Sequence, residues 1–204
     1  MKKIIGFALC LALLTAFIPT NVGARSEHIV CGPQRWEGEI DWDFLRVVRN
    51  DFEMAEKLGC SKLIVHFTSQ GGYVLNALMV VDEIRAAKSR GLLIEIHGGR
   101  LVASAALFVL AEGTPGYRYA QQDSLVVIHA MSARFGDCLV YPPPEAVSEE
   151  DQAIRQLYNM SFRVLARSTG WTVAQVKEWF DCSRSIVGGG EVLILYRLAD
   201  HMED

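Results

Sequence analysis

Residues 62–96 read KLIVHFTSQGGYVLNALMVVDEIRAAKSRGLLIEI, and this stretch decides the fold. Its first six residues form a short, apolar, β-branched run, as expected of a buried parallel strand. After a glycine pair, apolar residues recur at helical spacing until Gly91, and a second apolar run follows at 92–96. A strand, a helix and a strand in this order predict a βαβ unit with two parallel strands.

The same alternation continues on both sides of this unit. Gly59 and Gly170 each end an apolar helical pattern, and Thr172 can cap the helix that follows Gly170. We therefore expect an α/β fold with a mainly parallel sheet and peripheral helices. The further expected elements are a strand over 28–31, a helix ending at Gly59, a buried helix over 104–113, a strand over 125–128 and helices over 148–168, 172–180 and 191–197.

The N-terminus has the pattern of a secretory signal peptide. Two lysines precede a 15-residue apolar run, 4–18, and a small-x-small sequence ends at Ala24. The alternative is a membrane anchor, but the run is shorter than the ~20 residues that usually span a bilayer. We expect cleavage after Ala24, a single domain over residues 25–204, and a location in the bacterial periplasm.

Charge and cysteine content narrow the class of protein further. Loss of Lys2 and Lys3 with the signal peptide changes the net charge from −4 to −6, and no basic stripe remains to bind nucleic acid. In an oxidising compartment the four remaining cysteines allow two disulfides, for which we favour Cys31 with Cys60 and Cys138 with Cys182. Zinc is the alternative, but no CxxC pair is present, and we expect neither a metal nor a cofactor.

Three expected strand ends carry unusual residues: Gly71-Gly72, Ser104 and His129. In parallel α/β sheets such ends meet at one edge, where ligands bind. A glycine pair can present backbone N–H groups, a serine can act as nucleophile, and a histidine can take its proton. Taken singly, each has a structural explanation: an ordinary turn, a helix cap, and a histidine held by the fold.

The segment 63–130 resembles the proteolytic subunit of the Clp protease, a serine peptidase of the Clp and crotonase superfamily. Ser69-Gln70-Gly71-Gly72 stands where that family has Ser-Pro-Gly-Gly, and 102–106, VASAA, stands on its Ala-Ala-Ser-Met-Gly turn. The 25-residue interval from Ser104 to His129 equals the family's spacing of nucleophile and base. Residues 37–41, EGEID, resemble the family's opening Gly-Glu-Ile-Asp.

This resemblance implies the superfamily's repeated ββα spiral and a serine-peptidase site. Ser104 would be the nucleophile, His129 the general base, and the N–H groups of Gly72 and Ala105 the oxyanion hole. The substrates would be short or unfolded peptides, and the chain would form homo-oligomers.

Three departures from the family pattern stand beside the resemblance. The family's triad aspartate falls on Ser183 or Ser185, depending on the alignment, and Asp181 is the nearest carboxylate that could replace it. Gln70 replaces the proline and Ala106 the glycine of the two turns. Export would separate the chain from the cytoplasmic ATP-driven unfoldase of the Clp system, so we expect no ATPase partner.

Alternative assignments involve other residues and other functions. We interpret His97 as structural and His66 as a core histidine. Lys62 and Lys88 do not fit the serine–lysine motif of the signal peptide peptidase A family. The fold could also serve as a non-catalytic binding or scaffold protein, whereas crotonase-like thioester chemistry is disfavoured because an exported protein would not ordinarily meet coenzyme A.

Overall fold

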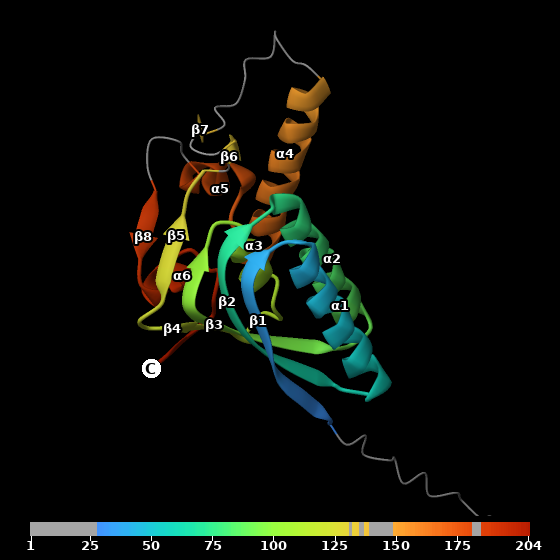
Figure 1. Cartoon of the computed structure of the whole chain (residues 1–204). Coiled ribbons are helices and arrows are strands. Elements are labelled where there is room, and N and C mark those ends of the chain that lie inside the picture. The colour runs from blue at the N-terminus through green and yellow to red at the C-terminus, as the bar shows by residue number, and fades with distance from the viewer. Residues whose placement is uncertain (1–27, 131, 135–136, 139–148, 181–184) are drawn as a thin grey trace, which may run out of the picture.

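A computed structural model describes residues 28–130, 132–134, 137–138, 149–180 and 185–204. Seven strands form the main, mostly parallel sheet, and helices α1 and α2 lie side by side against it (Figure 1). The mixed α/β architecture expected from the sequence is confirmed. The elements are β1 (Val30–Ile40), α1 (Trp42–Lys57), β2 (Lys62–Gly72), α2 (Val74–Ser89), β3 (Leu93–Ala103), α3 (Ala106–Ala111), β4 (Arg118–Gln121), β5 (Leu125–Ile128), β6 (Ser132–Arg134), β7 (Asp137–Cys138), α4 (Glu149–Thr169), α5 (Val173–Trp179), β8 (Ile186–Gly188), α6 (Gly190–Leu195) and β9 (His201–Glu203).

The sheet branches at its central strand. Strands β1, β2, β3, β4 and β9 are hydrogen-bonded in that order and run parallel. The first part of β3 pairs with β4, and its last part, at 101–103, pairs with β5, which in turn pairs antiparallel with β8. Strand β3 therefore reaches past β4 and delivers residue 104 to the end of β5.

Local sequence explains where the main helices begin. The Asp41 side chain accepts a hydrogen bond from the Phe44 N–H and caps α1, and a capping box of Thr172 and Gln175 starts α5. Helix α3 consists of six residues, ALFVLA, that are all buried, which agrees with the expectation of a fully apolar helix after Ser104. Its burial against the sheet holds the strand-to-helix turn in place.

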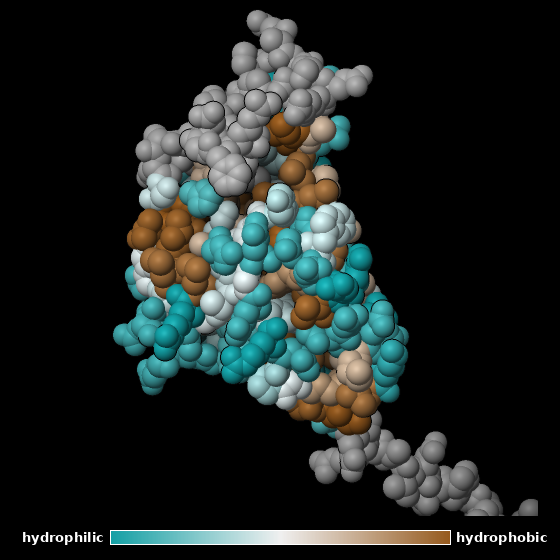
Figure 2. Space-filling model, viewed as in Figure 1, coloured by the Kyte–Doolittle hydropathy of each residue, from teal (hydrophilic) through white to brown (hydrophobic). Residues whose placement is uncertain are grey.

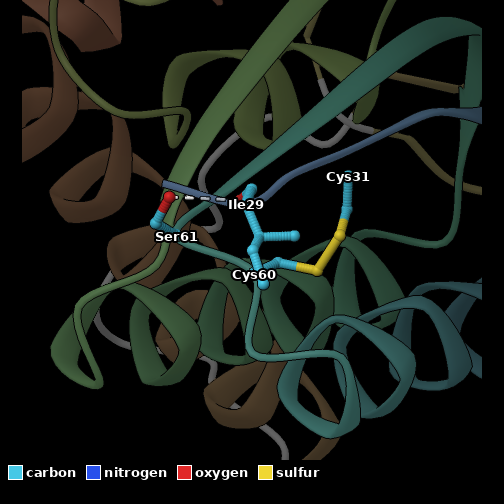
Figure 3. The surroundings of a disulfide bond; sticks show 4 residues. All are labelled: Ile29, Cys31, Cys60 and Ser61. Atoms are coloured by element: carbon cyan, nitrogen blue, oxygen red, sulfur yellow. Dashed lines mark hydrogen bonds between the residues drawn. A yellow bond between two sulfur atoms is a disulfide. The ribbon is translucent and has the colours of Figure 1, made fainter. Parts of the chain in front are cut away.

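A disulfide joins the starts of the first two strands (Figure 3). It links Cys31 to Cys60 across a Cα–Cα distance of 6.0 Å, the pairing that the sequence favours. Beside it, the Ser61 hydroxyl donates a hydrogen bond to the Ile29 carbonyl at 3.1 Å. Of the other expected pair, Cys182 and the side chain of Cys138 lie outside the described residues, so that pairing stays a prediction.

Buried ion pairs and a hydrogen bond tie helices α2 and α4 to the end of α3. Glu112 is 6% exposed and contacts the Arg85 and Lys88 side chains of α2 at 2.8 Å each, and it accepts a hydrogen bond from Ser168 of α4. Burial alone would raise the pKa of Glu112, but the hydrogen bonds from these groups outweigh it and hold the pKa below its ordinary value. The charged form of Glu112 is therefore part of the folded structure.

Figure 2 shows an apolar patch over β5 and β8 at one edge of the molecule. Leu125 is 49% exposed and Val187 is 62% exposed, and Val187 pairs with Val127 across the two strands. Within the described ranges, no helix has the length and apolar content needed to cross a membrane. The expected signal peptide, 1–24, lies outside those ranges.

Candidate active site

Ser104 stands between β3 and α3 with a left-handed backbone. Its φ is +56°, a conformation that few residues other than glycine adopt. Its N–H donates a hydrogen bond to the Val127 carbonyl of β5 at 2.9 Å, and its carbonyl accepts from the Leu107 N–H at 3.2 Å. A serine held on a sharp turn from a strand to a helix is the arrangement that exposes the nucleophilic hydroxyl in the α/β-hydrolase fold.

Two glycines at the end of β2 lie against this turn. Gly71 has φ +95°, and a Cβ built on it would stand 2.7 Å from the Ser104 Cβ and 2.9 Å from the Ala105 nitrogen. Gly72 has φ +152°, and its own Cβ would meet the backbone of Ile40 at 2.6 Å. Glycine is required at both positions because no side chain fits between these backbones.

His129 follows the last residue of β5. Its Nδ1 lies 2.7 Å from the carbonyl oxygen of Ala130. A carbonyl oxygen only accepts hydrogen bonds, so Nδ1 is the donor, and in the neutral ring Nε2 is the nitrogen that can take a proton. This is the tautomer that a general base needs.

The register of the sheet brings the expected site residues to one edge. Ala103 pairs with Val127, so Ser104 and His129 are among the first residues beyond the paired ends of β3 and β5. Gly71 of β2 packs on the other side of the Ser104 turn. The convergence of three strand ends is thus present, whereas Asp181 and Ser183 lie outside the described residues.

A hydroxyl, an imidazole and backbone N–H groups at one edge can carry out acyl transfer. The hydroxyl attacks a carbonyl carbon, the imidazole takes its proton, and N–H groups stabilise the oxyanion that forms. No group of histidine, cysteine and carboxylate side chains in the described part of the chain is arranged to hold a metal ion.

The other histidines have different environments. His97 contacts Glu203 through Nδ1 at 2.7 Å and Glu95 through Nε2 at 2.9 Å, which supports its structural interpretation. The expectation that His66 is a core histidine is wrong, because its side chain is exposed. In a strand the side chains alternate between faces, and His66 lies on the open face of β2, where its ring packs 5.2 Å from that of His97.

The two lysines of the alternative serine–lysine site are bound elsewhere. Lys62 pairs with Glu95 at 2.8 Å, and Lys88 pairs with Glu112 at 2.8 Å. Hydrogen bonds from Lys62 and His97 overcome the effect of burial and hold the pKa of Glu95 below its ordinary value. Both lysines therefore act as ion-pair partners of carboxylates.

Comparison with known proteins identifies the family of the chain. The model of the Clp protease family matches residues 36–194. The chain belongs to the Clp protease family. The matched range contains the glycine pair, Ser104 and His129.

Two known proteins match most of the length of the chain. The ATP-dependent Clp protease proteolytic subunit 2 of Corynebacterium efficiens is 26% identical over 164 residues, which cover 74% of this chain and 77% of that protein. The crystal structure of the ClpP protease catalytic domain from Plasmodium falciparum superimposes with a TM-score of 0.66 at 18% identity. That superposition covers 87% of this chain and 85% of the other, and it shows that the two share a fold.

Two features of the site were missed by sequence reasoning. The carbonyl of Ala130 orients His129, and a backbone oxygen leaves no mark in a sequence. The hydroxyl of Ser69 contacts the glycine turn. Its position directly before Gln70-Gly71-Gly72 was a signal, but only the structure shows what it contacts.

Proposed function

We propose that this chain is an exported serine peptidase of the Clp type that cleaves short or unfolded peptides. Ser104 is the nucleophile, His129 is the general base, and the N–H groups of Gly72 and Ala105 form the oxyanion hole. The observation that carries the proposal is the left-handed backbone of Ser104, which is packed against Gly71 and hydrogen-bonded to the end of the strand that precedes His129. A strained backbone at such a position costs folding free energy, and functional sites are where it is retained.

The reaction is an acyl transfer in two halves. The Ser104 oxygen attacks the peptide carbonyl while Nε2 of His129 takes the hydroxyl proton, and the same nitrogen then gives this proton to the departing amine. Water afterwards attacks the acyl-serine and returns the serine hydroxyl. The Ala130 carbonyl holds the Nδ1 proton of His129 throughout, and Asp181 is the carboxylate that could add to this orientation.

Location and partners form a second part of the proposal. Cleavage after Ala24 would release the domain into the periplasm, where the disulfide between Cys31 and Cys60 is stable. The Corynebacterium relative is named as ATP-dependent, whereas we propose that the exported chain works without an ATPase. Proteins of the Clp family form homo-oligomers, and we propose the same here, with no cofactor and no nucleic acid bound.

Intact-mass spectrometry after reaction with a fluorophosphonate probe tests the proposal. The purified protein should gain one adduct, and the Ser104→Ala variant should gain none. The same spectrum reports whether the chain begins at Arg25, and a non-reduced, thiol-alkylated sample reports the disulfides. Sedimentation velocity of the same sample reports its oligomeric state.

A non-catalytic scaffold is the second candidate, because Ser183 or Ser185 stands where the family has its acid. Absence of any adduct on the folded protein would refute the peptidase. Peptide binding that survives Ser104→Ala and His129→Ala together would then support the scaffold.

A further inference from the structure

One buried hydroxyl, that of Ser69, contacts the glycine turn beside Ser104. Ser69 is 1% exposed, and it stands two residues before Gly71 near the end of β2. Its Oγ donates a hydrogen bond to the Gly38 carbonyl of β1 at 2.6 Å. The same oxygen accepts a hydrogen bond from the Gly71 N–H at 3.0 Å.

This hydroxyl lies where the pairing of β1 with β2 becomes irregular. Glu37 pairs with Thr68 and Glu39 pairs with Gly71, so β2 advances by three residues while β1 advances by two. A bulge of this kind locally disrupts the regular ladder of hydrogen bonds. Ser69 supplies a partner for two backbone groups at this position, the carbonyl of Gly38 and the N–H of Gly71.

The contact engages one of the two backbone N–H groups of the glycine turn. The Gly71 N–H is bound to Ser69, and the Gly72 N–H is the one proposed to bind the oxyanion. Gly71 itself is held so close to the Ser104 turn that a Cβ on it would stand 2.7 Å from the Ser104 Cβ and 2.9 Å from the Ala105 nitrogen. A shift of Gly71 would therefore move both proposed oxyanion donors relative to the nucleophile.

We infer that Ser69 is a positioning residue for catalysis, which sets the geometry of the oxyanion hole through the Gly71 peptide. The inference rests on the proposed function and adds to it a residue that does not touch the substrate. Loss of one oxyanion-hole donor lowers kcat by about 10²–10³ in a serine protease. Misplacement of a donor that is still present should cost less, about 10- to 100-fold.

The chain offers a matched control in Ser124. This serine is also buried, at 3% exposed, and its Oγ also donates to a glycine carbonyl, that of Gly99, at 2.6 Å. Ser69→Ala and Ser124→Ala thus each delete one buried hydroxyl and its 2.6 Å hydrogen bond to a glycine carbonyl, and Ser69→Ala also removes the partner of the Gly71 N–H. They differ in whether that hydroxyl contacts the glycine turn.

The experiment measures fluorophosphonate labelling of the full-length chain over a range of probe concentrations, which separates KI from kinact. We expect Ser69→Ala to lower kinact by about 10- to 100-fold with KI unchanged, and Ser124→Ala to keep kinact within about twofold of the native protein. Melting temperatures should fall in both variants. Ser69→Thr, which keeps the hydroxyl, should recover most of kinact.

Three results would overturn the inference. Equal kinact for the two alanine variants would mean that Ser69 contributes only to stability. If Ser69→Ala does not fold, Ser69→Thr decides, and a folded Ser69→Thr variant as unreactive as Ser104→Ala would refute a role for the hydroxyl. A native protein that does not react with the probe would refute the proposed function itself, and this inference with it.

Discussion

Replacement of Gly71 with alanine tests the packing of the glycine turn against Ser104 directly. The chain provides a close control, because the φ of Gly91 is nearly the same as that of Gly71, +94° against +95°. A Cβ on Gly91 would meet no atom within 4 Å. A Cβ on Gly71 would stand within 3.0 Å of three atoms: the Ser104 Cβ, the Ala103 oxygen and the Ala105 nitrogen.

Both substitutions therefore place an alanine in a left-handed backbone, but only Gly71→Ala also overpacks its surroundings. An alanine in the left-handed region costs about 1–2 kcal/mol, and this is the whole expected loss for Gly91→Ala. Gly71→Ala adds the overpacking of a closed site, about 1–3 kcal/mol. Because the clashing atoms are backbone and Cβ atoms, the Ser104 turn must shift, and a shift approaching 1 Å can cost about 10²-fold in rate.

The assay combines denaturant unfolding with fluorophosphonate labelling of both variants. We expect Gly71→Ala to be less stable than Gly91→Ala and to react at least about 10-fold more slowly. Gly91→Ala should react at the native rate. Equal stability and equal labelling of the two variants would refute the reasoning, because it would show that the Ser104 turn does not need an empty position at residue 71.

Three further predictions concern the acid, the disulfide and a buried carboxylate. Asp181→Asn should lower the rate of fluorophosphonate labelling by less than about tenfold, because the Ala130 carbonyl already holds the His129 ring. A loss near the roughly 10⁴-fold that follows replacement of the triad aspartate in a serine protease would contradict this. Reduction of the Cys31–Cys60 disulfide, which spans 29 residues, should lower the free energy of unfolding by about 3–4 kcal/mol, measured as a lower denaturant midpoint. A Cys31→Ala/Cys60→Ala variant lacks this bond, so reduction should not remove this part of its stability. Because the pKa of Glu112 is lowered in the folded protein, its contribution to stability is complete at neutral pH and is lost as the pH falls below about 4.5 through the folded pKa. Glu112→Gln should therefore be less stable by about 3 kcal/mol at pH 7, and its stability should fall less steeply in acid. An unchanged acid dependence of stability would show that other carboxylates govern it.

Much of the fold could be predicted because it depends on local patterns. The expected helices of the βαβ unit and of 148–168 agree closely with α2 and α4, and the strand over 125–128 coincides with β5. Strands β2 and β3 are longer than expected, because their last residues are polar or small and lack an apolar run. Strands β4 and β9 were missed, since each is only three or four residues long and is defined by its pairing.

The error at His66 has a related cause. Its apolar neighbours suggested burial on both faces of β2, but helices cover only one face of the sheet at this strand, and His66 points to the other. Burial of a strand residue depends on what packs on its face, which the strand's own sequence does not contain.

The sequence by itself determined the α/β class, the membership in the Clp protease family that its motifs predicted, and the residues proposed for the chemistry, because periodicity and residue type are local properties of the chain. Only the tertiary structure decided how they meet. The branch of β3 toward β5 and the bulge bridged by Ser69 join backbone groups from separate strands. The contact of His129 with the Ala130 carbonyl depends on the orientation of one ring. Backbone hydrogen bonds carry no residue code, so their partners become known only when the strands are placed in register.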